Sequence, residues 1–289
     1  MTKEEFVNKY VSEHYPNLHV DLQNLMGGSD VKSLYDNLHA KLISLAGSNV
    51  SVDYPILHQY LNDLIYGFKP LDANGHDYVD MGEAGIWATC NVGATSPEQS
   101  GLYFQWGDTQ GYTAEQVRNG EKTFYLSDYK FSSDSASLEN PQFTKYCNDA
   151  QYGKDGFTDT LTVLQPEDDA AHVHMGGDWR MPTSDEFVKL YDLCNNSWVN
   201  DYEGTGVSGV LFTLKTDSSK QLFFRAAGYV SGEVSFDRYR TYVWSSSLYT
   251  NNSFTSLGLL GTDTDGVGPS GCINRYWGLS VRGILGVGE

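Results

Sequence analysis

The sequence predicts an α+β protein in which a small helical N-terminal region, residues 1–68, precedes a larger domain of short strands, long loops and few helices, residues 69–289. Apolar residues keep a helical spacing only as far as about residue 68. Aromatic residues make up 13% of the chain and Gly contributes 30 residues, which indicates many short strands and turns. The length of 289 residues is sufficient for a domain with its own core and a smaller companion.

Helical spacing recurs in three stretches of the N-terminal region, residues 6–11, 34–45 and 57–65. Thr2 and Glu5 fit a capping box at the start of the first stretch. Apolar stripes of this kind must pack against another surface. The sequence leaves three possible surfaces: the other N-terminal helices, the following domain, or sister subunits. An oligomer formed through these helices is therefore one of the expected alternatives.

One strong helix signal remains beyond residue 69. Pro182 precedes Thr183, which forms a capping box with Glu186, and an apolar stripe at helical spacing runs from Phe187 to Leu193. We therefore expect a helix that is opened by Pro182 and Thr183. Around it, Gly, Asn, Asp and aromatic residues become frequent, which is typical of short strands joined by loops.

Charge and hydropathy exclude several classes of partner. The formal charge of −18 and the scattered 19 Lys and Arg residues argue against a nucleic-acid or anionic-membrane surface, because phosphate binding needs clustered basic residues. No stretch approaches the ~20 apolar residues of a membrane span, so no membrane insertion is expected. The N-terminus MTKEEFVNKY has no apolar signal region, and we expect synthesis in the cytoplasm without a Sec signal.

The cysteines predict neither a zinc site nor a disulfide framework. Cys90, Cys147, Cys194 and Cys272 are widely separated and form no CxxC pair. Free thiols are therefore the expected state, and we expect neither a metal nor another cofactor.

The most informative feature is a gap in composition between residues 234 and 288. The first 233 residues carry 12 Lys, 12 Glu, 10 Gln and 5 Met, whereas these 55 positions carry none, and an even distribution would give about nine. Tyr, Phe, Ser, Thr, Gly, Asn and Asp fill the gap. This is the composition of an antibody-like paratope, in which aromatic residues provide rigid contact area and small polar residues provide adaptable hydrogen bonds.

The gap also has a genetic interpretation. Codons that end in C or T cannot encode Lys, Glu, Gln, Met or Trp. Randomisation of Asn-type codons at their first two positions would therefore produce such a gap, except for Trp at fixed positions such as Trp244 and Trp277. The alternative is an ordinary set of Gly- and Ser-rich surface loops.

Several motifs occur in a fixed order along residues 72–285. They are DYVD at 77–80, WATCNVGA at 87–94, YFQWG at 103–107, DDAAH at 168–172, GGDWRMPT at 176–183, AAGY at 226–229, WSSS at 244–247 and GLSVR at 278–282. In this order the chain resembles the Fibrobacter succinogenes major paralogous domain family, which is common in gut Bacteroidetes and their phages.

The resemblance implies a C-type-lectin-like fold of the kind seen in formylglycine-generating enzymes. A subset of the family is similar to the variable proteins of diversity-generating retroelements, whose adenine-directed mutagenesis rewrites Asn-type codons just upstream of the closing Ser-Val-Arg segment. The composition gap lies in that place. Composition and resemblance together predict a variable segment at about residues 237–277.

The function that we expect is binding of a protein or glycan receptor on a cell surface, by a phage or prophage adhesin that is assembled into a phage particle. Tyr249, Phe254 and Tyr276 would be anchors and Asn251, Asn252, Ser270 and Asn274 would form the rim. Leu257 and Leu259 should face inward, whereas Leu260, Val267 and Ile273 would form an exposed apolar patch. The candidate positions are Tyr239, Tyr242, Tyr249, Asn251, Asn252, Phe254, Gly258, Leu260, Thr262, Asp263, Asp265, Val267, Ser270, Cys272, Ile273, Asn274 and Tyr276.

These candidate positions should cluster on one exposed face. In particular, Tyr249, Asn252, Leu260, Asp263 and Tyr276 are expected to be exposed neighbours. The intervening WSSS and WGL motifs would be fixed strands that hold the loops. Trp87, Trp106, Trp179 and Trp244 are expected in the core.

Other residues could carry chemistry, and each has a structural alternative. His172 and His174 would share one face of a strand and could bind a metal beside Asp168 and Asp169, but further ligands are missing and a scaffold role is favoured. The DTDG motif at 263–266 resembles the start of a calcium loop without its closing Glu, so a turn is favoured.

Arg180 and Arg282 are expected to pair with carboxylates such as those of Asp178 or Asp185. No catalytic residue is expected, because Cys272 has no neighbouring Cys of the kind on which formylglycine-generating enzymes depend, and no GxSxG motif occurs. Two alternative functions remain: a surface or glycan-binding protein of constant specificity, and a divergent enzyme of the formylglycine-generating type.

Overall fold

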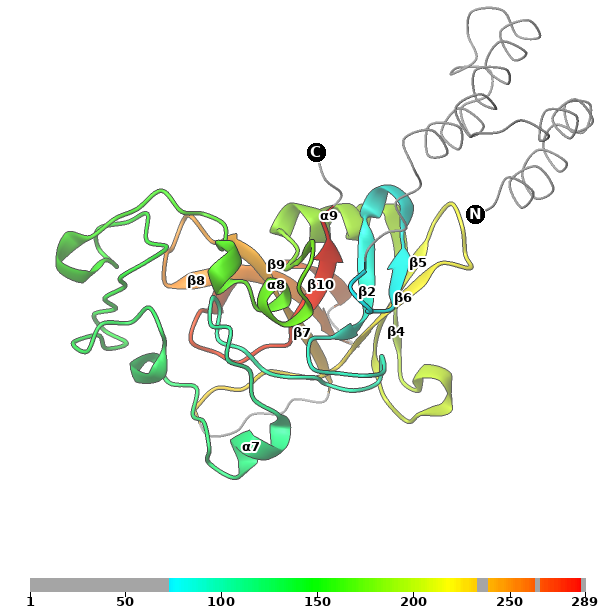
Figure 1. Cartoon of the computed structure of the whole chain (residues 1–289), viewed down its shortest axis with the longest axis horizontal. Coiled ribbons are helices and arrows are strands. Elements are labelled where there is room, and N and C mark those ends of the chain that lie inside the picture. The colour runs from blue at the N-terminus through cyan, green and yellow to red at the C-terminus, as the bar shows by residue number, and fades with distance from the viewer. Residues whose placement is uncertain (1–72, 233–238, 263–265, 287–289) are drawn as a thin grey trace, which may run out of the picture. The chain divides into compact units, whose positions relative to one another are not determined.

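The computed structural model describes residues 73–232, 239–262 and 266–286 (Figure 1). The chain divides into the units Met1–Asp72 and Ala73–Glu289. The helices expected within residues 1–68 lie outside the described residues, as do Asp263 and Asp265. The following description therefore concerns the second unit alone.

This unit is an α+β domain built mostly from antiparallel sheets. Its first sheet has the order β1 (Tyr78–Asp80), β2 (Ile86–Asn91), β10 (Arg282–Leu285) and β3 (Trp179–Arg180). The last strand therefore pairs antiparallel with β2 on one side and β3 on the other, and Figure 1 shows the red β10 beside the cyan β2.

Two further sheets are each formed by three consecutive antiparallel strands. One contains β4 (Cys194–Val199), β5 (Gly209–Leu214) and β6 (Gln221–Arg225), and the other contains β7 (Arg240–Leu248), β8 (Thr255–Thr262) and β9 (Gly266–Asn274). The register shifts between Trp244 and Leu248 in the β7–β8 pair and between Ser256 and Gly258 in the β8–β9 pair. The composition gap thus falls mainly on this third sheet.

Where the structure describes the domain, its α-helices are α7 (Ala114–Arg118), α8 (Ala170–Met175) and α9 (Ser184–Leu193). The helix predicted from the capping box is confirmed as α9: the Thr183 hydroxyl accepts the Glu186 N–H and the Glu186 carboxylate accepts the Thr183 N–H. The helix ends where Cys194 becomes extended and opens β4.

The main core lies between α9 and the sheets. Phe187 and Leu190 of α9 pack in one cluster with Phe212 of β5, Val243 of β7 and Leu259 of β8. The expectation for the framework tryptophans is confirmed, because Trp87, Trp106, Trp179 and Trp244 are all 0% exposed.

Residues 92–169 connect β2 to α8 with little regular structure. They contain α7 and the 3-10 turns η3 (Leu126–Asp128), η4 (Lys154–Gly156) and η5 (Pro166–Asp168). Loops of this length are uncommon in compact domains and are usually functional. The end of this connection lies against β7, since the Leu164 N–H donates to Ser246 O and the Leu248 N–H donates to Thr162 O.

Candidate functional site

The third sheet and its turns hold the candidate positions, but at three levels of exposure. Tyr239, Asn251 and Cys272 are exposed, and Tyr249, Asn252, Phe254, Leu260, Val267 and Asn274 are half-buried. We call these residues the candidate surface. The remaining candidates with described side chains are buried: Tyr242, Gly258, Thr262, Ile273 and Tyr276.

The prediction that Tyr249, Asn252, Leu260, Asp263 and Tyr276 are exposed neighbours is therefore wrong in part. Tyr249, Asn252 and Leu260 are half-buried and Tyr276 is only 9% exposed. The structure does not describe Asp263 or the side chain of Ser270.

The predicted apolar patch is also wrong. Ile273 is only 4% exposed, and Val267 packs against the main core. Leu260 is half-buried, Leu259 faces the core as expected, and Leu257 is half-buried. A register shift in the β8–β9 pair accompanies this departure from simple alternation, because a bulge changes which side chains face one side of a sheet.

The turn between β7 and β8 contains four of the candidate positions, of which Asn251 is exposed and Tyr249, Asn252 and Phe254 are half-buried. Its backbone is closed by hydrogen bonds from Asn252 N to Tyr249 O and from Thr255 N to Asn252 O, both 3.0 Å. The Asn252 side chain is used inside the turn, because its Oδ1 accepts the Phe254 N–H at 3.0 Å. Asn251 is left exposed at the tip.

Residues of the long connection, 92–169, also hydrogen-bond to this turn. Asn148 Nδ2 donates to Thr250 O at 2.8 Å, and Ser253 Oγ donates to Asn148 Oδ1 at 2.7 Å. The Phe254 ring lies 6.0 Å from Phe143 and 5.8 Å from Tyr276. The turn is therefore fixed to residues more than a hundred positions earlier in the chain.

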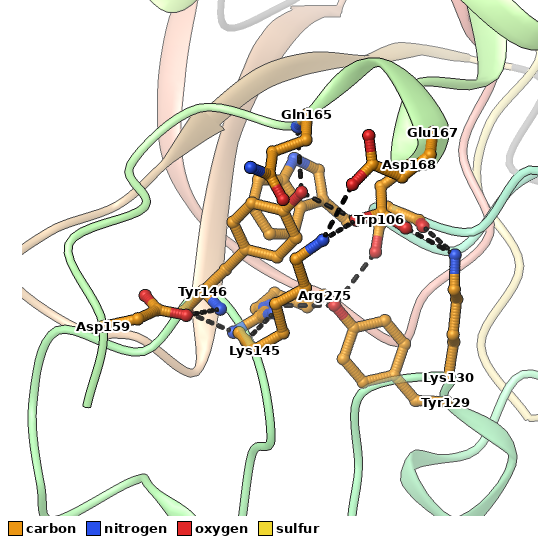
Figure 2. A network of polar contacts seen from close by, with 11 residues as sticks. Trp106, Tyr129, Lys130, Lys145, Tyr146, Asp159, Gln165, Glu167, Asp168 and Arg275 are labelled. Carbon is orange, nitrogen blue, oxygen red and sulfur yellow. Dashed lines mark hydrogen bonds and ion pairs between the residues drawn. The ribbon is translucent and has the colours of Figure 1, made fainter. Parts of the chain in front are cut away.

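Arg275 forms the centre of a buried network beneath this turn (Figure 2). Its side chain is 0% exposed and its guanidinium donates to the hydroxyl of Tyr129 and to the carbonyls of Lys145, Tyr146 and Ser253. Burial raises the pKa of Tyr129, so its hydroxyl stays protonated and donates in turn to Trp106 O at 2.9 Å.

Asp168 forms an adjoining ionic centre. Lys130 Nζ and Lys145 Nζ each lie 2.6 Å from its carboxylate, and the Tyr146 hydroxyl donates to it at 2.8 Å. Burial alone would raise the pKa of Asp168, but these hydrogen bonds from Lys130, Lys145 and Tyr146 outweigh it and lower the pKa. Lys145 and Tyr146 join the two centres, because their backbone carbonyls accept from Arg275.

An aromatic group adjoins the candidate surface near β7. The rings of Tyr229 and Trp277 stack at 4.7 Å, and Tyr242 meets Tyr229 edge-on at 5.0 Å. Within the described ranges, the Nε1 of Trp277, the Oγ of Ser256 and the Oε1 of Gln105 are buried without a hydrogen-bond partner. Gln105 Nε2 donates to Tyr276 O, so all three atoms lie in or against the gap segment.

The two histidines do not converge on a metal site. They lie on α8 rather than on a strand, because Asp169 caps a short helix by accepting the His172 N–H. His172 Nδ1 meets Trp179 O at 3.1 Å, and His174 Nε2 meets Thr109 O at 2.8 Å. In the part of the chain that the structure describes, no three His, Cys, Asp or Glu side chains are grouped to hold a metal.

The expectation that the two arginines pair with carboxylates is confirmed for Arg180 and wrong for Arg282. Arg180 pairs with Glu186 at 2.6 Å, rather than with Asp178 or Asp185. Arg282 is fully buried, and its guanidinium donates to carbonyls and to the amide oxygen of Asn91.

All four cysteines are free thiols, as expected, and Cys272 is exposed at φ 71°. Burial raises the pKa of the Cys147 and Cys194 thiols, so they are not activated nucleophiles.

Sequence reasoning missed Arg275, Asn148 and the Tyr229–Trp277 pair. One signal was available for the first of these. Arg275 is the only basic residue between Thr241 and Val281, in a segment otherwise filled by small polar and aromatic residues.

The described residues form an α+β domain with mostly antiparallel sheets, and the candidate surface lies on the third sheet and on the segments that flank its strands. No protein-family model matches the chain, and neither a curated protein nor a solved structure shows detectable similarity to it. None of the helices in the described residues has the length and apolar character to cross a membrane.

Proposed function

We propose that residues 73–289 form a C-type-lectin-like binding domain whose C-terminal surface is diversified by a retroelement and binds a protein or glycan receptor on a cell surface. The observation that carries the proposal is the absence of Lys, Glu, Gln and Met from residues 234–288. A phage or prophage adhesin is the context in which such a surface would act. No chemical step is part of this function.

The arrangement of the gap segment supports a division into framework and recognition residues. Ser245, Ser246 and Ser247 of the WSSS motif are buried in β7, whereas Asn251 at the following turn is exposed. Tyr249, Phe254 and Asn274 are half-buried, so each has part of its side chain available to a partner. Aromatic and amide side chains of this kind are the usual anchors and rim of a paratope.

The sheet order supports the lectin-like assignment. The last strand β10 pairs with β2, the second strand of the domain, so the two ends of the domain meet in one sheet. The long irregular connection of residues 92–169 and the three-stranded β7–β9 sheet are consistent with a fold that carries its binding site on loops.

A binding protein of constant specificity is the second candidate. The observation that favours it is the burial of Tyr242, Gly258, Thr262, Ile273 and Tyr276. Randomisation at buried positions would often unfold the domain, because large changes of volume in a core are destabilising.

Complete sequencing of the encoding locus separates the two candidates. Diversification requires a near-copy of codons 237–277 beside a reverse-transcriptase gene, with adenines where the two copies differ. We expect the differing codons to include those of Tyr249, Asn251 and Asn274, and to exclude those of Ser245 and Arg275. A locus without a near-copy would overturn the proposal in favour of constant specificity.

A further inference from the structure

Arg275 lies between two candidate positions in the sequence but points away from them. Asn274 is half-buried and its Nδ2 donates to the Tyr276 hydroxyl at 3.2 Å, so these two side chains lie together. The Arg275 side chain is 0% exposed and lies among Tyr129, Lys145 and Tyr146 of the long connection (Figure 2). A fully buried arginine therefore directly follows a half-buried candidate position in the sequence.

The guanidinium of Arg275 joins separate segments of the chain. Its Nε donates to the Tyr129 hydroxyl at 2.9 Å, and its Nη2 donates to Lys145 O at 3.1 Å. Its Nη1 donates to Tyr146 O at 2.9 Å and to Ser253 O at 3.0 Å. The first three acceptors belong to the long connection, whereas Ser253 belongs to the β7–β8 turn.

Aromatic rings surround the same cation. The centre of the guanidinium lies 4.5 Å from the ring of Phe143, 4.8 Å from Trp106 and 5.3 Å from Tyr129. No carboxylate pairs with Arg275 among the described residues. Neutral carbonyls, one phenol and ring faces therefore stabilise the buried charge, and these acceptors are strongly directional.

We propose that Arg275 is a positioning residue, which fixes the β7–β8 turn and the pair Asn274–Tyr276 in one geometry against the long connection. This inference rests on the proposed function, because it assigns to one constant residue the task of holding the variable positions around it. Side chains at 251 and 274 could then change while the backbone that presents them is kept. The binding site would thus include a constant edge formed by the connection, where exposed Asn148 lies beside the turn.

Lysine cannot replace Arg275 in this arrangement. The planar guanidinium carries five donors in a rigid fork, whereas an ammonium is a compact charge on a flexible stem. A lysine ammonium at this position could not make all four of these hydrogen bonds, because the acceptors lie around different edges of the planar guanidinium. The contact that residue 275 makes between the β7–β8 turn and the long connection would then be broken.

Hydrogen–deuterium exchange on the full chain tests this role through Arg275→Lys. The matched control is Arg282→Lys, since Arg282 is also 0% exposed, donates to neutral acceptors and lies 4.6 Å from the ring of Phe224, but contacts no part of the candidate surface. In Arg275→Lys we expect exchange at the amides of Asn252, Thr255 and Trp277 to become about tenfold faster or more, with the amides of β5 unchanged.

In Arg282→Lys the amides of the β7–β8 turn should exchange no faster, relative to the other amides of the domain, than they do in the unsubstituted protein. A purely structural role for Arg275 would instead accelerate exchange in the turn and in β5 together. That outcome, or unchanged exchange in the turn, would overturn the inference.

A milder pair of variants keeps the test decisive if Arg275→Lys does not fold. Tyr129→Phe removes one acceptor of Arg275 and keeps the ring, whereas Tyr103→Phe removes a buried hydroxyl that donates to Ala227 O at 2.8 Å. We expect faster exchange in the β7–β8 turn for the first variant only. Equal exchange in both variants would contradict the positioning role.

The exchange measurements are independent of any receptor. A locus without a near-copy would remove the proposed function but would leave the positioning of the turn by Arg275 in place. Unchanged exchange in Arg275→Lys would remove the positioning role and leave diversification untouched. The two failures are therefore distinguishable.

Discussion

Substitution of Gly258 by Ala tests whether every candidate position can vary. Gly258 lies in β8 opposite Trp244 of β7 and Ser270 of β9. A Cβ atom at this position would lie 2.5 Å from the carbonyl oxygen of Val243 and 3.2 Å from Cδ1 of Ile273. The first of these contacts is with backbone, so a strand must shift to relieve it.

We expect a loss of about 2 kcal/mol, because overpacking of a well-packed interior usually costs about 1–3 kcal/mol. For a domain of this size the melting midpoint should fall by about 4–8 °C. The control is Gly268→Ala on the neighbouring strand, where a Cβ atom would meet nothing within 4 Å. This control should change stability by less than about 1 kcal/mol and can raise it, because Ala restricts the unfolded chain.

Thermal and urea unfolding of both variants measure the difference. A Gly258→Ala protein as stable as Gly268→Ala would refute the strand register on which the argument rests. The expected outcome removes codon 258 from the positions that a retroelement could rewrite without loss of the fold.

Trp179→Ala should lower the free energy of unfolding by about 3–5 kcal/mol, because Trp179 is 0% exposed. Tyr239→Ser should change it by less than about 0.5 kcal/mol, because the Tyr239 side chain is 69% exposed. Equal losses of stability in urea unfolding would contradict the assignment of Trp179 to the core and of Tyr239 to the surface. Asp168→Asn should lower the melting midpoint at pH 7, and the difference from the unsubstituted protein should shrink as the pH falls below about 4, since the lowered pKa of Asp168 contributes stability that is lost only on protonation. A difference in melting midpoint that grows on acidification would contradict a lowered pKa for Asp168. Addition of a chelator should leave the midpoint unchanged, and a drop reversed by calcium would reveal a bound ion.

Substitution of Tyr249, Phe254 and Tyr276 together by Ser would test stability as well as binding, because Tyr276 is 9% exposed and Phe254 packs between Phe143 and Tyr276. Exposed Asn251 is the better position at which to change the surface without changing the fold.

Local signals in the sequence predicted local structure well. The start of α9 follows from Thr183 and Glu186 alone, because a capping box needs only residues three positions apart. His172 and His174 were misplaced on a strand, since the helix that holds them is only six residues long and shows little periodicity.

Long-range packing decided the rest. The gap in composition covers most of the third sheet, but Val267 packs against a core to which α9 and β5 contribute and Ile273 is only 4% exposed. No local pattern in the sequence shows this burial. Arg275 meets acceptors about 130 positions earlier in the chain, at residues 145 and 146, so its role becomes visible only in the folded domain.

The place of β10 in the first sheet has a consequence for synthesis of the protein. Among the described strands β10 is the last to be translated, yet it is hydrogen-bonded between β2 and β3. Until it is inserted, both of those strands present unpaired edges, which are sites of aggregation and proteolysis. A nascent chain interrupted anywhere in the gap segment would therefore lack the strand that completes the sheet, and only chains translated through residue 285 could pass from a vulnerable intermediate to a stable product.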